Sequence, residues 1–512
     1  MKKRIIAMFL CVCLALSLCA CGKNAAKNDK ESAGKDNAAK ISVVNIPYNS
    51  TDSFNPFKAK TSLNCNVATL IFDPLFYIDN EYNLQPCLAD NYEANGKTCA
   101  VTIKKVKFSD GSVLTADDVV YSFNAAKKYS KRYASQLKTV TAAATDSSTV
   151  TFTCTKNDPY MINLLTFPIF KKGSDKLTDD DKVEIPPIGC GRYVLSEDKL
   201  TLSANKNWHG GKLSIKSVRL INAPDSESLS HAVEIGAIDI YYTDLSDGTI
   251  LRMSGERQNV NLNNLVYVGI NHSNKMLANN NMRQAISAAL DRKKLCESSF
   301  FTNAVAATGI FNPAWQPTKS IQSIENTANS KIAIENLEQI GYNKKDNGIY
   351  YENANGDTIT LRLLVNKENK FRLNAANMVV DQLKSVGIKV NLEAVSYKKY
   401  LTRLKQGSFD LYIGEVNILD NMDVSEILLA GGKSAYGLKS KNSSIKTTQS
   451  MVKKFYKGEA AVTDIAAYAI SEMPIIPLCY RTGVQVLGEN VKADADAYSG
   501  NIYHPLNQMK IK

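Results

Sequence analysis

The side chains that could carry out a reaction are few in this sequence and lie far apart. No Gly-x-Ser-x-Gly, Cys/His or His-Glu-x-x-His arrangement is present, so a hydrolase would lack both a nucleophile and a base. No two histidines have the spacing of ligands to one zinc ion. We therefore expect no enzyme activity, no cofactor and no metal site. The four histidines are His209, His231, His272 and His504.

Three acidic side chains lie close enough in the sequence to be considered for acid–base chemistry. Asp110 belongs to an Asp-Gly-Ser turn, and Asp117 and Asp118 follow Thr115. Threonine is a common helix N-cap, and acidic residues in the first turn interact favourably with the helix dipole. We therefore predict a turn followed by a helix that begins at Thr115.

The cysteines beyond the N-terminal segment show no functional spacing. There are seven, an odd number, and no two are closer than twelve positions, which excludes the CxxC pattern of redox and zinc-ribbon sites. An exported protein could pair some of them, but we expect buried free thiols. These residues are Cys65, Cys87, Cys99, Cys154, Cys190, Cys296 and Cys479.

The composition is that of a folded protein, with 44% hydrophobic and 22% charged residues. At roughly 150 residues per domain, the 512 residues suggest about three domains or lobes. Lys and Arg exceed Asp and Glu by 62 to 50, but the basic residues are scattered as pairs rather than gathered in a block. We therefore expect no nucleic-acid partner. Since no segment reaches the roughly 20 apolar residues of a membrane span, we also expect a soluble body.

The N-terminal residues have the pattern of an export signal. Basic residues at positions 2–4 precede an apolar run over residues 5–18. The run ends in Leu-Cys-Ala-Cys-Gly, which resembles the lipobox of bacterial lipoproteins, in which Cys21 would be acylated and become the first mature residue. Alternatively, Cys21 is one more small apolar residue in a cysteine-rich signal. Residues 22–40 lack large apolar side chains, which predicts a flexible tether.

The elements that could position a binding site are clearest between residues 358 and 423. Apolar side chains there change repeatedly between strand-like and helical spacing. The expected elements are a strand over 358–365, a helix ending at Gly387, a strand over 388–392, a helix over 397–405 before Gly407, and a strand over 409–416.

This order is βαβαβ, which implies a parallel sheet with right-handed crossovers. Ligands of such sheets bind in the crevice beyond the carboxyl ends of the strands. The segments that leave those ends are residues 366–369, 396–397 and 417–423. We therefore expect the ligand site beside these three segments.

Other segments give weaker patterns. An apolar stripe predicts one amphipathic helix over residues 282–295, preceded by a strand over 265–270. In the N-terminal half, residues 98–108 and 150–155 look like strands. This half is typical of an α+β arrangement with many short strands.

Seven short motifs follow one another along the body. They are LADNYE with VKFSDGSVLTADDVVYSF in residues 87–123, IGCGRY at 188–193, NKNWHGG at 205–211, IGAID at 235–239, YVGIN at 267–271, RQAI with DR at 283–292, and IIPL at 475–478. Together they resemble the motifs of the large extracytoplasmic solute-binding proteins of peptide, dipeptide and nickel ABC importers, family 5. The resemblance covers nearly everything from about residue 42 to the end.

This resemblance implies an α/β, two-lobed periplasmic-binding-protein-like clamp (type II, cluster C) with an extra α+β subdomain in the N-terminal lobe. The chain would cross between lobes near residues 264–271 and 474–486, and a hinge would close over the ligand. The expected boundaries are a lipoprotein signal peptide over 1–20, a lipidated Cys and flexible tether over 21–40, lobe I over 41–62 with 185–265 and 487–512, the extra subdomain over 63–184, and lobe II over 266–486.

The resemblance also implies ligand-binding residues. In peptide-binding members, an aspartate after the strand that holds Asp410 pairs with the α-amine of the ligand, and Asp420 matches it. The family usually has a Trp a few residues earlier, where this chain has Val416 and Asn417. Asn417 and Asp423 in the same segment therefore stay candidates beside Asp420, and a solvent-facing loop acid is the alternative.

Two aromatic residues are further candidates, for the walls of the cleft: Phe54, beside an Asn-Pro pair, and Trp315, after Phe-Asn-Pro. Simple packing is the alternative for both.

The function implied by the resemblance is that of a substrate-binding lipoprotein of an ABC importer, which captures short peptides and delivers them to permease subunits. It would be an extracytoplasmic monomer held at the bacterial cell membrane by its lipid anchor. Alternatives are another solute, such as nickel, an opine or an oligosaccharide, or a lipid-anchored peptide receptor without transport.

Overall fold

The computed structural model describes most of the chain beyond residue 42. The described ranges are residues 43–178, 180, 184–246, 253–345, 348–438 and 443–511. The predicted signal peptide, Cys21 and the tether lie outside the described residues. Among the helices within these ranges, none is both long and apolar enough to cross a membrane.

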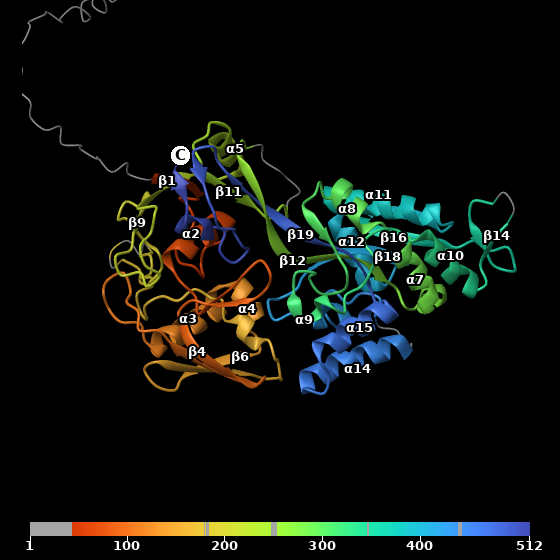
Figure 1. The fold of residues 1–512 in the computed structure, drawn as a ribbon, viewed down its shortest axis with the longest axis horizontal. Coiled ribbons are helices and arrows are strands. Elements are labelled where there is room, and N and C mark those ends of the chain that lie inside the picture. The colour runs from red at the N-terminus through yellow and green to blue at the C-terminus, as the bar shows by residue number, and fades with distance from the viewer. Residues whose placement is uncertain are drawn as a thin grey trace, which may run out of the picture. The chain divides into compact units, whose positions relative to one another are not determined.

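The first sheet joins segments that are far apart in the sequence, with strand order β1-β10-β9-β8. Its strands β1 and β9 are labelled in Figure 1. β1 (Val43–Tyr48) pairs in parallel with β10 (Ser217–Asn222), and β9 (Thr201–Ala204) and β8 (Tyr193–Leu195) continue antiparallel. α2 (Ser62–Ile71) packs against β1 and β8. Other short elements of the chain are β2 (Phe76–Ile78), β3 (Leu84–Pro86), α5 (Ser226–Glu234), β20 (Val491–Lys492), η2 (His504–Asn507) and β21 (Lys510–Ile511).

A second four-stranded sheet is antiparallel, with strand order β4-β5-β7-β6. Its strands are β4 (Ala89–Ala94), β5 (Thr98–Ile103), β6 (Val140–Ala144) and β7 (Thr149–Cys154). Along β5, buried and half-buried residues alternate, so one face of the sheet packs on the core. The helical elements of this region are α3 (Ala116–Tyr129), α4 (Lys131–Gln136) and η1 (Met161–Leu164).

The predicted turn and helix start in this region are confirmed. Asp110 accepts a hydrogen bond from the Ser112 backbone N–H at 3.0 Å, which closes the turn. Thr115 is the N-cap of α3, and its backbone N–H donates to the Asp118 carboxylate at 2.8 Å. The acids thus serve a turn and a capping box, as expected.

The third sheet has seven strands and contains the predicted βαβαβ unit. Its order is β11-β19-β12-β18-β16-β17, and β13 pairs with β19. β16 (Thr360–Asn366) pairs in parallel with both β17 (Lys389–Val395) and β18 (Leu411–Asn417), which confirms the prediction. The crossover helices are α11 (Lys370–Ser385) and α12 (Tyr397–Gln406). α12 ends where Gly407 adopts a left-handed φ of 70°, which glycine tolerates without a Cβ penalty.

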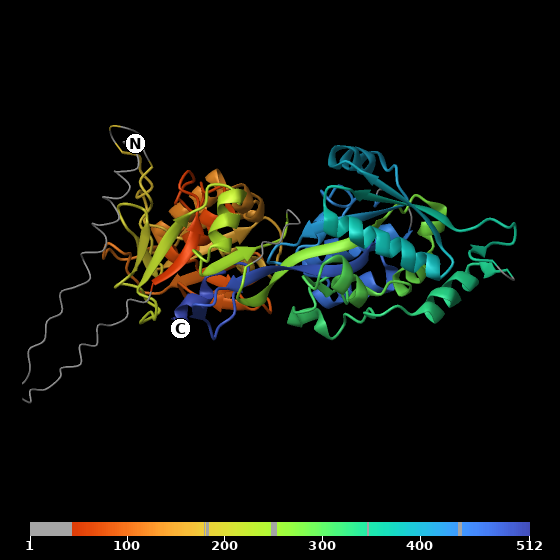
Figure 2. The same cartoon turned by 90° about the horizontal axis from the view of Figure 1, so that it is seen from above.

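Two long strands run side by side through this sheet (Figure 2). β12 (Glu256–Ile270) and β19 (Ile476–Leu487) are antiparallel, and their register shifts between Asn261 and Leu265 of β12. One end of β19 pairs with β11 (Ile240–Thr243), while β13 (Ala304–Ala306) pairs further along it. Both strands therefore continue without a break from one side of the register shift to the other.

The remaining elements cover the seven-stranded sheet or extend from it. They are α6 (Lys275–Ala278), α7 (Asn280–Ala288), α8 (Arg292–Ser299), α9 (Gln316–Lys319), α10 (Ser330–Gln339), β14 (Asn343–Lys344), β15 (Tyr351–Glu352), α13 (Ser425–Leu428), α14 (Ser443–Lys457) and α15 (Val462–Glu472).

Three predicted elements differ in the structure. The strand expected over residues 98–108 ends at Ile103, because the chain turns there and the Val106 N–H donates to the Lys104 carbonyl at 3.0 Å. The single helix expected over residues 282–295 is two helices, because Asp291 caps the start of α8 by accepting a hydrogen bond from the Lys294 N–H at 2.8 Å. The strand expected over 265–270 begins at Glu256, because β19 pairs with its polar first half.

The cysteine prediction is confirmed for six residues and wrong for one. All seven cysteines of the body are free, and six are buried, but Cys65 on α2 is exposed.

Candidate ligand-binding site

The strand order of the parallel unit reverses beside β16. β17 lies on one side of β16 and β18 on the other, so the expected crevice opens between the carboxyl ends of β16 and β18. Asn366 ends β16 and Asn417 ends β18. The segment over residues 418–424, which we call the crevice loop, leaves the sheet at this position.

Hydrogen bonds hold the crevice loop against distant parts of the chain. The Ile418 N–H donates to the carbonyl of Asn263 in β12 at 2.8 Å. The Asn163 side chain, from η1, donates to the Asp420 carbonyl at 3.1 Å, and the Asn421 side chain donates to the Asp158 carboxylate at 2.7 Å. The loop after the parallel sheet therefore contacts the segment that follows the antiparallel sheet.

The Asp420 side chain lines a cavity of about 580 Å³. This volume lies within the roughly 300–1,000 Å³ typical of small-molecule sites. Most of its other wall residues come from α2, from α4 and from the residues just before each helix. The aromatic members of the wall are Phe57, Phe72, Tyr77, Tyr129 and Tyr133. The cavity therefore combines a loop from the crevice with a largely apolar wall from the N-terminal half.

The charged residues of the described wall are one acid and four bases. The acid is Asp420, and the bases are Lys58, Lys60, Lys131 and Arg132. Lys58 has a protein partner, the Glu184 carboxylate at 2.8 Å. The cavity thus offers both signs of charge, with positive charge in excess.

Asp420 and Arg132 lie close enough to influence each other's ionisation. Burial raises the pKa of Asp420, and the positive charge of Arg132 opposes that rise. The pKa of Arg132 is raised by Tyr133 first and also by Asp420, against the effect of burial. The Arg132 guanidinium also lies over the Tyr133 ring, 5.3 Å from its centroid. The cavity therefore places a carboxylate near a guanidinium that rests on an aromatic face.

The other two candidates in the same segment have different surroundings. Asn417 is exposed, and its side-chain amide donates to the Asn264 side chain at 2.8 Å. Asp423 accepts a hydrogen bond from the Ser425 N–H at 2.8 Å at the start of α13, and the Tyr456 hydroxyl also bonds to it. Neither residue is among the described wall residues of the Asp420 cavity.

The two aromatic candidates are packed among other rings. Phe54 is 6% exposed and stacks on Tyr48, with ring centroids 5.9 Å apart. Trp315 is 2% exposed and contacts Phe311 and Tyr160, with centroids at 5.3 and 5.1 Å. The structure thus places both in aromatic clusters and not on the described wall of the Asp420 cavity.

Sequence reasoning missed the bases and tyrosines of the wall. Arg132 and Tyr133 lie on α4, a six-residue helix within a stretch rich in Lys, Arg and Tyr. That local enrichment was the available signal, but it has no periodicity or spacing that points to Asp420. Only the fold brings them near the crevice loop.

Comparison with known families is decisive for the class of protein. The family described as bacterial extracellular solute-binding proteins, family 5 (middle part), matches residues 83–435, which is more than half of the chain. The chain belongs to this family. The resemblance found in the seven motifs is thereby confirmed, and the molecule is a solute-binding protein of an extracytoplasmic family.

Curated family 5 relatives are moderately similar in sequence. The oligopeptide-binding protein AppA of Bacillus subtilis (strain 168) is 26% identical over 436 residues, which cover 80% of this chain and 80% of AppA. The glutathione-binding protein GsiB of Escherichia coli (strain K12) is 25% identical over 293 residues, which cover 54% of this chain and 57% of GsiB. The names of these relatives thus refer to oligopeptides and to glutathione.

Solved structures show the same fold. The periplasmic murein tripeptide-binding protein MppA, in its unliganded open form, has a TM-score of 0.73 and 20% identity, over 92% of this chain and 98% of MppA. NikA from Brucella suis, in complex with Fe(III)-EDTA, has a TM-score of 0.69 and 18% identity, over 92% of this chain and 100% of NikA. The fold of this family 5 protein is therefore the expected α/β, two-lobed periplasmic-binding-protein-like fold.

Proposed function

We propose that this protein captures short peptides for an ABC importer and delivers them to the permease subunits. The observation that carries the proposal is that Asp420 and Arg132, which bear opposite charges, line one cavity. They come from two distant parts of the chain, the crevice loop and α4. A ligand that bridges them would connect those two parts.

A short peptide has the matching charges at its two ends. Its α-ammonium can pair with the Asp420 carboxylate, and its terminal carboxylate can accept paired hydrogen bonds from the Arg132 guanidinium. Burying either charge without a partner would cost several kcal/mol. The aromatic wall offers apolar contact area for side chains between the two ends.

The strand arrangement supports closure of two lobes around such a ligand. β12 and β19 would cross between the proposed lobes I and II, and their register shifts between Asn261 and Leu265. Irregular pairing bends a strand locally and weakens its ladder, which suits a hinge. The lobe boundaries of the sequence analysis, 41–62 with 185–265 and 487–512 for lobe I and 266–486 for lobe II, remain part of this proposal.

An anionic metal chelate is the second candidate ligand. The four bases against one acid in the described wall favour a ligand with excess negative charge. One structural neighbour holds Fe(III)-EDTA, and another is described as a nickel ABC transporter from Bacillus halodurans. A chelate would use the bases and leave Asp420 without an ammonium partner.

Native mass spectrometry of the purified protein, followed by calorimetry, distinguishes the two ligands. We expect a retained peptide mass, and binding of a free tripeptide that weakens when the peptide is N-acetylated or C-amidated. Binding of Fe(III)-EDTA together with no response to any free tripeptide would contradict the peptide proposal and support the chelate.

We also propose that the protein is a lipid-anchored monomer that starts at an acylated Cys21. Two acyl chains are needed for stable anchoring, because one alone binds a membrane only marginally. Wild-type protein should partition into the detergent phase with Cys21 as its first residue, and Cys21→Ser protein should be uncleaved or shed. A mature N-terminus at another residue would contradict the anchor. An adjacent permease and ATPase in the genome would favour import over a receptor without transport.

A further inference from the structure

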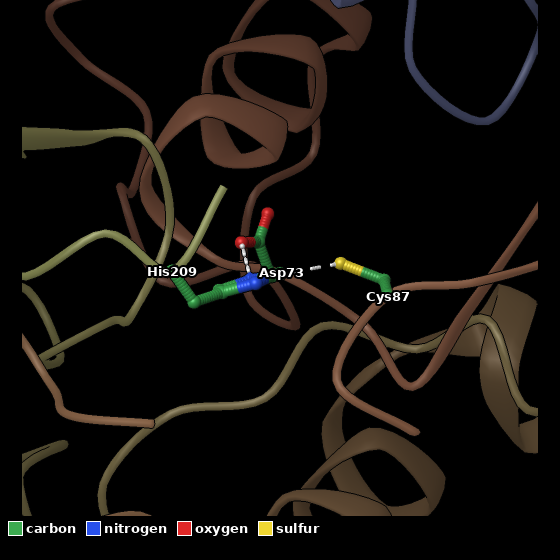
Figure 3. A group of neighbouring side chains, drawn as sticks. All are labelled: Asp73, Cys87 and His209. Atoms are coloured by element: carbon green, nitrogen blue, oxygen red, sulfur yellow. Dashed lines mark hydrogen bonds and ion pairs between the residues drawn. The ribbon is translucent and has the colours of Figure 1, made fainter. Parts of the chain in front are cut away.

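Three side chains with metal-binding atoms meet outside the ligand cavity (Figure 3). Asp73 follows α2, Cys87 follows β3, and His209 lies in the loop after β9. His209 Nε2 lies 3.0 Å from Asp73 Oδ2 and 4.0 Å from Cys87 Sγ, and the three ligand atoms all lie within 4.8 Å of one another. Thiol, imidazole and carboxylate thus converge from three separate segments.

These distances fit one small cation. Tetrahedral zinc is bound by nitrogen and oxygen at about 2.0–2.2 Å and by sulfur at about 2.3 Å, so adjacent ligand atoms lie about 3.3–3.6 Å apart. The 3.0 Å between His209 Nε2 and Asp73 Oδ2 is shorter than that value and the 4.0 Å between Nε2 and Cys87 Sγ is longer, so a bound ion would require small shifts of these side chains. We propose that Asp73, Cys87 and His209 bind one divalent cation that accepts thiolate and imidazole ligands, with zinc as the best fit.

The carboxylate is already oriented by neighbouring donors. The Tyr77 hydroxyl donates to Asp73 Oδ1 at 2.9 Å, and Trp208 Nε1–H donates to Oδ2 at 3.0 Å. Asp73 is only 2% exposed, so its rotamer is fixed by packing as well. In known metal sites, hydrogen bonds of this kind orient the side chains that bind the ion and reduce the cost of ordering them.

The thiol is held with similar rigidity. The Cys87 backbone N–H donates to the Leu75 carbonyl at 2.9 Å, and the Cys87 carbonyl accepts a hydrogen bond from Lys104 Nζ at 2.7 Å. Cys87 lies at the end of the hairpin formed by β2 and β3. The thiol therefore has a backbone anchored on both sides.

A hydrated ion can reach this cluster. Asp73, Cys87 and Trp208 line a second cavity of about 410 Å³, and the His209 side chain is 17% exposed. Three protein ligands and an open cavity leave a fourth position for water, as in zinc sites with an open coordination position. The cavity also contains Asp79 and Arg192, whose charges offset each other.

The alternative is a purely structural hydrogen bond from the His209 Nε2–H group to the Asp73 carboxylate. In that case Cys87 would be an inert buried thiol. The two alternatives differ in whether the thiol contributes to cation binding, so a thiolate-specific signal separates them.

Cobalt is a suitable spectroscopic probe, because a Co²⁺–thiolate bond gives a charge-transfer band in the near ultraviolet. Full-length protein freed of metal with a chelator should take up one equivalent of Co²⁺ with this band, and zinc should displace the cobalt. Cys87→Ser should abolish the band, and His209→Gln should weaken affinity at least about 10- to 100-fold. Cys65→Ser and His231→Gln are matched controls at exposed positions and should bind like wild type.

The wild-type measurement decides the proposal even if a variant folds poorly. Absence of the thiolate band in wild-type protein with saturating Co²⁺ would overturn it, and so would an unchanged band in Cys87→Ser. Asp420→Asn should keep cobalt binding, so a failure of the peptide proposal is distinguishable from a failure of this one.

Discussion

Replacing Asp420 by Asn tests the proposed peptide site most directly. The substitution keeps the shape of the side chain and removes its charge. At an ammonium–carboxylate separation of about 4 Å, the Coulomb attraction is about 4 kcal/mol for an effective dielectric constant of about 20. This agrees with the roughly 3–5 kcal/mol lost when one partner of a buried pair is removed. The expected loss in affinity is therefore about a hundredfold to several thousandfold.

The surroundings of Asp420 should also lower the affinity of the Asn variant for a free-amine peptide. Without its charge, the described wall of the cavity would carry only bases, which repel an ammonium group. Burial also raises the pKa of Asp420, so its carboxylate is protonated at higher pH than an ordinary aspartate. Wild-type affinity for a free-amine peptide should therefore fall as pH drops towards that pKa, and affinity of the Asn variant should change less.

Isothermal titration calorimetry with a free-amine peptide and its N-acetylated form measures the effect. Wild type should lose affinity on acetylation, and Asp420→Asn should discriminate little between the two peptides. Asp423→Asn is the matched control in the same loop, and it should retain the discrimination. Equal affinity of wild type and Asp420→Asn for the free-amine peptide would refute the reasoning, and Asp423 or a non-peptide ligand would then be preferred.

Three further predictions concern charge, motion and pH. Arg132→Gln should weaken binding of a peptide with a free carboxylate about 10- to 100-fold, by loss of a charged hydrogen bond worth about 1.5–3 kcal/mol; calorimetry that shows the same loss with the C-amidated peptide would contradict this role. If β12 and β19 form a hinge, a confirmed ligand should reduce the radius of gyration in small-angle scattering, and identical radii would contradict closure. Burial lowers the pKa of His272 to about 4, so the unfolded state binds its proton more readily than the folded state does. The stability contributed by neutral His272 should be complete above about pH 6.5 and lost as pH falls to about 4, with a loss of about 2 kcal/mol by pH 5. Chemical unfolding at pH 7.5 and 5 should show this loss in wild type and not in His272→Gln.

The geometry around His272 explains the direction of that shift. Its side chain is 1% exposed, and Nε2–H donates to the Pro474 carbonyl at 2.9 Å. Nδ1 is buried without a hydrogen-bond partner among the described residues. Protonation would therefore place an unpaired N–H and a charge in the core.

The parallel unit could be predicted from the sequence because its information is local. Strand and helix periodicities alternate over residues 358–416, and glycines at 387 and 407 mark the helix ends. In a parallel sheet of this kind the ligand crevice lies beyond the carboxyl ends of the strands. The position of Asp420 beyond a strand end therefore follows from the sequence alone.

Non-local features could not be predicted in the same way. Arg132 reaches the cavity because the region that contains α4 contacts the crevice loop through Asn163, and no spacing in the sequence encodes that contact. The expectation of no metal site rested on histidine spacing, but the proposed ligands Asp73, Cys87 and His209 come from three segments joined only by the fold.

The hydrogen bonds of the crevice loop also connect ligand binding to the proposed hinge. The carbonyl of Asp420 accepts a hydrogen bond from Asn163, and the adjacent Asn421 donates to Asp158. If the lobes separate, these two bonds break, and the Asp420 carboxylate moves away from Arg132. A ligand that needs both charges then binds the closed arrangement better than the open one, and this difference in affinity is what shifts the population towards closure. A ligand held by Arg132 and the lysines alone would bind the cavity with a smaller preference between the two arrangements. A peptide without its free amine should therefore bind with less compaction than the intact peptide, even at saturation.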